Sequence, residues 1–160
     1  MGTSIPTPVF WKNPVHLLAF GLGSGASPWA PGTVGSGLAL LLYLLLPALV
    51  WWVYLLFLLL AFALGVWICE TTSRALQIQD HPGIVFDEFV GLWISLFMLP
   101  TGWQWLLAGF LLFRLLDIVK PWPIKWADRE VHGGLGIMLD DAIAGIMAAL
   151  SLQAMALLVS

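Results

Sequence analysis

Long apolar runs separated by short polar segments dominate the chain. No Asp, Glu, Lys or Arg occurs over 13–69, 89–113 or 142–160. The second and third runs have 25 and 19 residues, close to the roughly 20 that one helical membrane span needs. The first run is much longer and must contain more than one helix. The pattern therefore predicts several membrane-embedded helices.

Proline and glycine divide these runs, because proline lacks a backbone N–H and glycine favours turns. Irregular structure is expected within residues 24–37, at 79–85, at 100–102 and in the glycine-rich stretch 133–136. Breaks are expected at the prolines at positions 47, 121 and 123. The predicted helices are Asn13–Leu22, Val34–Leu46, Pro47–Ile68 with a polar continuation to Ile78, Phe86–Leu99, Trp103–Val119, a short piece Ile124–Val131, and Leu139–Leu158.

These elements predict an all-α fold, a compact polytopic membrane helical bundle with about five membrane-embedded helices, some of them short. At 160 residues the chain is expected to be a single integral-membrane domain over residues 1–160. Its charged fraction is 9%, whereas about a quarter of residues are charged in soluble proteins. Residues 1–11 carry no Lys or Arg and include a Pro-rich run, so no cleavable signal is expected.

Charge placement predicts an orientation and excludes one class of partner. If the helices alternate in direction, all Lys and Arg fall at or near one face, which the positive-inside rule places in the cytoplasm. These residues are Lys12, Arg74, Arg114, Lys120, Lys125 and Arg129. The net charge is −3 and no basic stripe is present, so nucleic-acid binding is not expected. The expected surroundings are membrane lipid, and no obligatory protein partner is evident.

Acidic residues gather beside the apolar runs, where charge is costly unless it is paired, hydrated or coordinating an ion. Two pairs are each followed by a glycine suited to close packing, Gly91 and Gly145. An ordinary alternative is capping, since both pairs are expected to open helices, where an acid contributes about 0.3–1 kcal/mol. Oxygen ligands from several helices instead favour Mg²⁺. The candidate metal ligands are Asp87, Glu88, Asp117, Asp140 and Asp141.

Arg114, Asp117 and Lys120 are spaced i, i+3, i+6 and share roughly one helix face. An arginine can fork onto two phosphate oxygens, and a lysine can add a point charge. The alternative is a salt-bridge ladder along the helix.

The Gly-rich segment before residue 37 is a second candidate phosphate site, because free N–H groups at a helix N-terminus favour anions. The residues concerned are Gly32, Thr33, Gly35 and Ser36. A plain inter-helix loop is the alternative. His81, near the acids, is a candidate general acid, with an ordinary surface loop residue as the alternative.

Four motifs in order resemble the phosphatidylglycerophosphatase A family. They are WAPGTVGS at 29–36, HPGIVFDEFVG at 81–91, FRLLDIVKPWPI at 113–124 and GIMLDDAIAG at 136–145. The resemblance covers about Asn13 to Ala149. It implies a Mg²⁺-dependent bacterial phosphatase that converts phosphatidylglycerophosphate to phosphatidylglycerol in the cytoplasmic membrane. Catalytic roles for Asp87, Asp117, Asp141 and His81 are our inference from the residues.

A small ion transporter or channel subunit with a carboxylate-lined cation path is the alternative function. A transporter should carry ionisable groups in the middle of its spans. The middle of each predicted span is uncharged. The sequence therefore favours the phosphatase.

Overall fold

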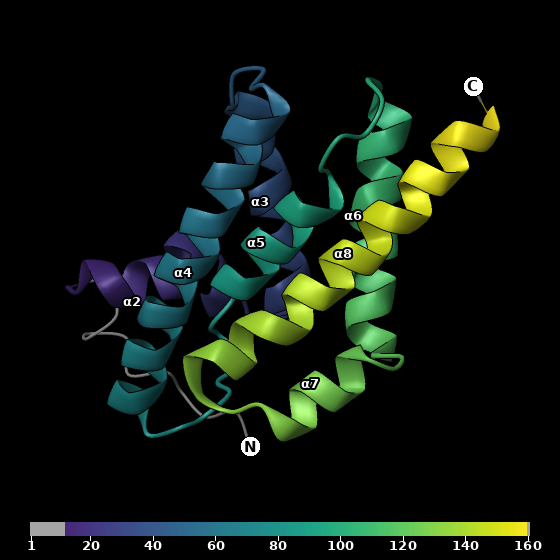
Figure 1. Ribbon diagram of the computed structural model, residues 1–160. Coiled ribbons are helices and arrows are strands. Elements are labelled where there is room, and N and C mark those ends of the chain that lie inside the picture. Colours follow the sequence, from purple (N-terminus) through teal and green to yellow (C-terminus); the bar gives the residue numbers. More distant parts are fainter. Residues whose placement is uncertain (1–11, 160) are drawn as a thin grey trace.

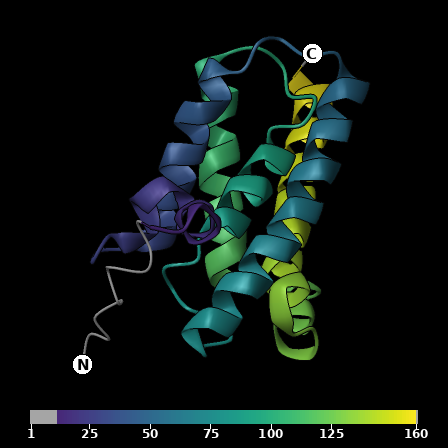
Figure 2. The same ribbon diagram turned by 90° about the vertical axis from the view of Figure 1, so that its left-hand side faces the viewer.

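The computed structural model describes residues 12–159, and every regular element in that range is helical, which confirms the all-α prediction there. Residues 1–11, where no cleavable signal is expected, lie outside the described range. The long helices stand side by side, and the short α2 and α7 run obliquely to them (Figure 1, Figure 2). The elements are α2 (Pro14–Ala19), a 3-10 helix η1 (Gly21–Ala26), α3 (Pro31–Leu45), α4 (Trp51–Leu76), α5 (Phe86–Ser95), α6 (Trp103–Val119), α7 (Ile124–Glu130) and α8 (Gly133–Val159).

Two of these helices, α4 and α8, are long and apolar enough to cross a membrane. They contain 26 and 27 residues, which corresponds to about 40 Å at 1.5 Å per residue. Helix α3 is also apolar but has 15 residues. Helix length thus makes membrane association plausible, and the expectation of about five embedded helices stays a prediction.

Several predicted helix boundaries are wrong. Helix α3 starts at Pro31 and not at Val34, because the missing N–H of proline costs nothing in a first helical turn. Helix α4 starts at Trp51, after the non-helical residues 47–50. Helix α5 ends at Ser95, four residues early, and the chain then turns through Met98 at a φ of 55°. The irregular stretch expected from residue 24 is thus shorter than predicted.

The largest correction concerns the start of α8, which is Gly133 and not Leu139. The backbone N–H of Gly134 donates to the carboxylate of Glu70 on α4. A Cβ on Gly134 would lie 2.1 Å from the carbonyl oxygen of Val66, so only glycine permits this approach. The glycines predicted to form a loop instead let the first turn of α8 pack against α4.

Helix α5 lies at the centre of the bundle and packs against α3, α4, α6 and α8. Its closest approach to α8 is at two glycines, since a Cβ on Gly145 would lie 2.3 Å from the carbonyl oxygen of Gly91. A Cβ on Gly91 would lie 2.5 Å from the ring of Phe113 on α6. These contacts confirm that Gly91 and Gly145 are close-packing residues.

The direction of the helices brings the charged segments to one end of the bundle, which lies at the bottom of Figure 1. Helices α3, α5 and α8 begin at that end, and α4 and α6 finish there (Figure 1). The connections 46–50 and 96–102 lie at the opposite end and carry no charge. The polar motifs therefore meet although they are far apart in the sequence.

Candidate active site

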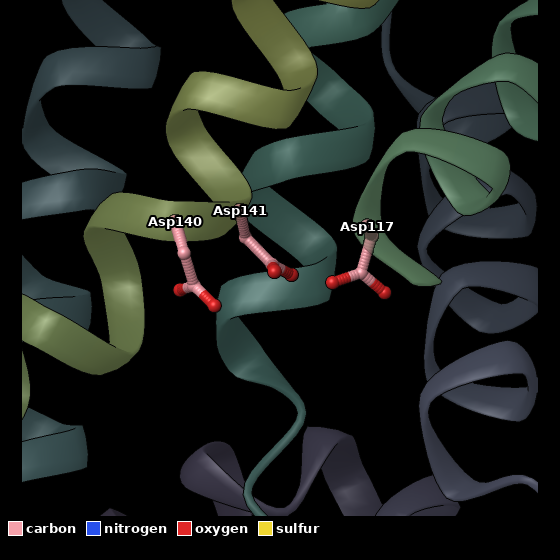
Figure 3. A group of neighbouring side chains, drawn as sticks. All are labelled: Asp117, Asp140 and Asp141. Carbon is pink, nitrogen blue, oxygen red and sulfur yellow. The ribbon is translucent and has the colours of Figure 1, made fainter. Parts of the chain in front are cut away.

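Three carboxylates from α6 and α8 form the centre of the site. One oxygen atom each of Asp117, Asp140 and Asp141 lies within 4.8 Å of the others. Figure 3 shows the three side chains directed into the same space. Asp140 and Asp141 are buried, and they lie two turns inside α8 rather than at its start. Helix capping therefore does not explain the Asp140–Asp141 pair.

Asp141 has a buried oxygen atom, Oδ2, that accepts no hydrogen bond from any described group. The residue is 3% exposed, so water does not replace that partner readily. An ionised carboxylate in such a place is costly unless a cation or hydrogen bonds compensate it. Carboxylate oxygens from two helices are the donors that Mg²⁺ accepts. The donor set and the unpartnered oxygen both fit a hard divalent cation.

A cavity of about 190 Å³ opens beside these acids. The predicted site residues that line it are Gly32, Asp87, Glu88, Asp117, Lys120, Asp140 and Asp141. The predicted residues that do not line it are Thr33, Gly35, Ser36, His81 and Arg114.

Sequence reasoning missed three polar residues of the cavity wall, namely Gln79, Asp80 and Asp128. Asp80 directly precedes the motif at 81–91, and this position is the one feature of the sequence that could have indicated a place in the cavity wall. Asp128 follows a helix break, so no periodic spacing links it to Lys120.

Asp87 and Glu88 lie in the first turn of α5, as predicted, but they have different partners. Glu88 accepts hydrogen bonds from the hydroxyl of Ser36, at 2.7 Å, and from the guanidinium of Arg114. Oδ1 of Asp87 accepts the backbone N–H of Glu88 at 2.9 Å. Glu88 is thus neutralised within the protein, whereas no ion pair is seen for Asp87 among residues 12–159.

The guanidinium of Arg114 bridges α3, α5 and α6. Its Nη1 donates to Glu88 and, at 2.7 Å, to Oδ2 of Asp117. Its Nη2 lies 3.4 Å from the hydroxyl of Thr33, and its Nε is buried without a described partner. The ion pair with Asp117 is the salt bridge considered as an alternative from the spacing. The structure brings the arginine fork to two carboxylates rather than to the cavity.

Lys120 lies just beyond the last turn of α6 and lines the cavity. Its Nζ donates to Oδ1 of Asp128 at 2.6 Å and to Oδ2 of Asp140 at 2.7 Å. Burial alone would lower the pKa of Lys120, but these two carboxylates outweigh burial and raise it. Lys120 is therefore a cation at neutral pH, at the edge of the acidic cluster.

The first turn of α3 receives a carboxylate of the protein itself. A Cβ on Gly32 would lie 2.0 Å from Oε1 of Glu88, so this glycine makes room for that side chain. Ser36 is fully buried, and its single O–H lies within hydrogen-bond distance of Oε2 of Glu88, at 2.7 Å, and of the carbonyl oxygen of Gly32, at 2.9 Å. Gly35 packs against Val85. The segment predicted to bind phosphate thus lies against the carboxylate of Glu88, and its role toward phosphate stays a prediction.

His81 is buried behind the cavity wall. Its Nδ1 accepts the backbone N–H of Gly83 at 3.0 Å, and its ring centroid lies 5.6 Å from that of Phe20. Burial lowers the pKa of His81, so the ring is neutral at pH 7. This placement supports a role in shaping the loop before Asp87, and the general-acid role stays a prediction.

Comparison with known proteins agrees with the motifs. Residues 17–156 match the family model for phosphatidylglycerophosphatase A. Phosphatidylglycerophosphatase A of Escherichia coli K12 is 52% identical over 139 residues, covering 86% of this chain and 81% of that protein. The Haemophilus influenzae protein of the same name is 46% identical over 138 residues, covering 85% of each.

A third relative has a different name. A putative phosphatidylinositol-3-phosphatase of Bacteroides thetaiotaomicron is 42% identical over 139 residues, covering 81% of this chain and 86% of that protein. No solved structure matches the chain. The family model covers far more than half of the chain. The chain therefore belongs to the phosphatidylglycerophosphatase A family.

Proposed function

We propose that this protein is a Mg²⁺-dependent enzyme of the bacterial cytoplasmic membrane that hydrolyses phosphatidylglycerophosphate to phosphatidylglycerol and phosphate. The observation that carries the proposal is the cluster of Asp117, Asp140 and Asp141, with its unpartnered oxygen, beside the ammonium of Lys120. A phosphomonoester dianion needs positive charge from a metal and from side chains. The proposed substrate follows from the names of two relatives, which are both phosphatidylglycerophosphatase A.

Asp117, Asp140 and Asp141 would hold the metal ion, and Asp87 adds a further carboxylate to the same cavity. When bound, Mg²⁺ offsets the charge of the phosphate and stabilises negative charge on the leaving oxygen. Glu88, also a predicted ligand, is already engaged by Arg114. We assign Glu88 and Arg114 to the support of Asp117.

Hydrolysis breaks the bond between phosphorus and the ester oxygen, and a water oxygen takes that place on phosphorus. The water loses a proton, and the alkoxide of phosphatidylglycerol gains one. Asp87 lines the cavity outside the three-acid cluster and is placed to accept the proton of the water. Lys120 is placed to contact a phosphate oxygen as a point charge.

The exposed side chains support a multi-pass arrangement. Helices α3 and α6 present large apolar residues to their surroundings, namely Leu41, Leu44, Leu45, Leu107, Leu111, Leu115 and Ile118. Exposed tryptophans, Trp103 and Trp122, flank α6, and such rings favour the membrane–water interface. The 17 residues of α6 rise about 26 Å, slightly less than a bilayer core of about 30 Å.

The membrane placement explains how a lipid substrate reaches the site. Lys120 lies two residues from Trp122, and thus at the proposed interface. A phosphomonoester headgroup lies at that depth while its acyl chains remain in lipid. The positive-inside rule assigns this end to the cytoplasm, since the connections at the other end carry no charge.

Substrate comparison with purified protein in mixed micelles tests the function. Phosphate release should be fastest from phosphatidylglycerophosphate, with kcat/KM at least about tenfold above that for phosphatidylinositol 3-phosphate, which corresponds to about 1.4 kcal/mol. Glycerol 3-phosphate, which lacks acyl chains, should be a poor substrate. Preference for the inositol lipid would contradict the assigned substrate, and no release from either lipid would contradict the phosphatase.

A further inference from the structure

The ammonium of Lys120 is shared between a carboxylate of the acidic cluster and one outside it. Asp140 belongs to the cluster on α6 and α8, whereas Asp128 lies on α7. The two Nζ–oxygen distances are nearly equal, at 2.6 Å to Asp128 and 2.7 Å to Asp140. An ammonium group has three donors, so these two carboxylates occupy most of its capacity.

We propose that Lys120 couples metal binding to phosphate binding, and that Asp128 is the positioning residue that keeps Lys120 available for both. The proposal rests on the proposed function of the same site. Without a metal ion, Lys120 neutralises Asp140. A divalent cation held by the cluster competes with Lys120 for Asp140. The donor released from Asp140 then serves the phosphate, while Asp128 holds the ammonium at the cavity.

The fold supports Asp128 in this role. Helix α7 is anchored by Ile124 and Ala127, which are fully buried, and it packs against α8. Asp128 directly follows Ala127 and reaches the cavity wall, where it meets Lys120. Lys125 is on the same short helix but is exposed and does not line the cavity. The helix thus places one acid at the site and leaves a neighbouring cation outside it.

Coupling of this kind is reciprocal, because two ligands that share a competing group change each other's affinity by the same factor. Inorganic phosphate should therefore bind weakly to the metal-free protein and more tightly once the metal is bound. Part of that enhancement passes through Lys120. It should be smaller when Lys120 is replaced by an uncharged residue of similar length.

A double-mutant cycle with metal affinity as the readout tests the proposal. Mg²⁺ and Mn²⁺ binding is measured by calorimetry on purified protein in detergent, for the unmodified chain, Lys120→Met, Asp128→Asn and the double variant. Lys120→Met should bind metal more tightly, because a competing cation is lost. Asp128→Asn should bind metal about fivefold more weakly, because Lys120 then turns fully to Asp140. In the Lys120→Met background, Asp128→Asn should have little effect.

The cycle separates this account from simple charge effects. If the negative charge of Asp128 attracts the metal directly, Asp128→Asn weakens metal binding equally in the unmodified chain and in Lys120→Met. That additive result would overturn the proposal. Phosphate titrations should show a smaller metal-induced gain in Lys120→Met, and an unchanged gain would also overturn it. Lys125→Met is the matched control and should behave as the unmodified chain.

Folding and the proposed function are checked separately. Thermal melts establish that each variant is folded, and Asp128→Glu, which keeps the charge, should restore metal affinity if Asp128→Asn lowers it. Loss of affinity in the Glu variant equal to that of the Asn variant would count against the ion pair. If the effects of the two substitutions on metal affinity are additive and the protein still releases phosphate from the lipid, the coupling is refuted and the proposed function is not. If the effects are non-additive but the protein has no phosphatase activity, the proposed function is refuted and the coupling is not.

Discussion

The acidic side chains at the charged end differ in how far they are compensated by other groups of the protein. Glu88 is bound by Arg114 and Ser36, and Asp140 is bound by Lys120. Oδ2 of Asp141 has no hydrogen-bond partner among the described residues. A buried carboxylate oxygen without a partner lowers stability, because nothing in the protein compensates its loss of hydration. Asp141 is therefore the residue whose removal best separates function from stability.

Asp141→Asn should lower phosphatase activity at least a hundredfold, about 2.7 kcal/mol or more in the barrier, because the proposed metal site would lose a charged ligand. The same change should leave the melting temperature in detergent equal or higher, since a buried charge is removed. Activity and thermal melts of the purified variant check both expectations. Asp117→Asn and Asp87→Asn should also be strongly impaired. Near-normal turnover in all three variants would contradict the assigned roles.

Arg114 is expected to matter first for stability. Arg114→Met leaves Glu88 buried without its cation and should lower the free energy of unfolding by about 3–5 kcal/mol. Arg114→Met combined with Glu88→Leu should recover part of that loss, because the buried Glu88 charge is removed while Asp117 still lacks its arginine partner. Chemical denaturation in detergent measures both. If Arg114→Met is instead fully stable but raises KM for the lipid substrate, the arginine contacts phosphate and our placement of it is wrong.

At the level of elements, the positions of the acids depend on how closely α8 approaches its neighbours. Gly145 lies one turn beyond Asp141 and touches the backbone of Gly91 on α5. Gly134 brings the first turn of α8 against α4. Both contacts fix the part of α8 that carries Asp140 and Asp141. Small changes in helix packing should therefore displace these carboxylates.

Gly145→Ala should lower both stability and activity, because the added methyl group meets a backbone oxygen and forces α5 and α8 apart. The expected loss is about 1–3 kcal/mol, as for overpacked cores. Gly37→Ala is the matched control, since nothing lies within 4 Å of its Cβ position on α3. That control should be stabilised by about 0.5–1 kcal/mol. Equal behaviour of the two variants would contradict the role of the close crossing.

Helix boundaries set by a local turn or by prolines could be predicted from the sequence. Boundaries set by tertiary contacts could not. Helix α6 runs over Trp103–Val119 as predicted, because a turn precedes it and prolines follow it. The start of α8 was misplaced because its glycines resemble a loop until Val66 is known to lie against them. Likewise, the charge pattern located the five acids, but only the fold shows that Arg114 binds carboxylates and that Asp128 joins the site.

For the whole molecule, the orientation in the membrane can be tested with cysteine labelling. On a Cys69→Ala background, Thr101→Cys should react with an impermeant thiol reagent in intact cells, since residue 101 lies in the uncharged connection. Lys125→Cys should react only after permeabilisation, because α7 lies at the charged end. Both positions are exposed in the structure. The reverse labelling pattern would place the active site on the outer face.

The central claim is that the acidic cluster makes this chain a metal-dependent lipid phosphatase. The most direct measurement is phosphate release from phosphatidylglycerophosphate by purified protein before EDTA, after EDTA, and after Mg²⁺ is restored, with Asp141→Asn in parallel. We expect activity to disappear with EDTA, to return with Mg²⁺, and to stay absent in the folded variant at every metal concentration. Full activity of the unmodified protein in EDTA, or of Asp141→Asn in Mg²⁺, would contradict the account.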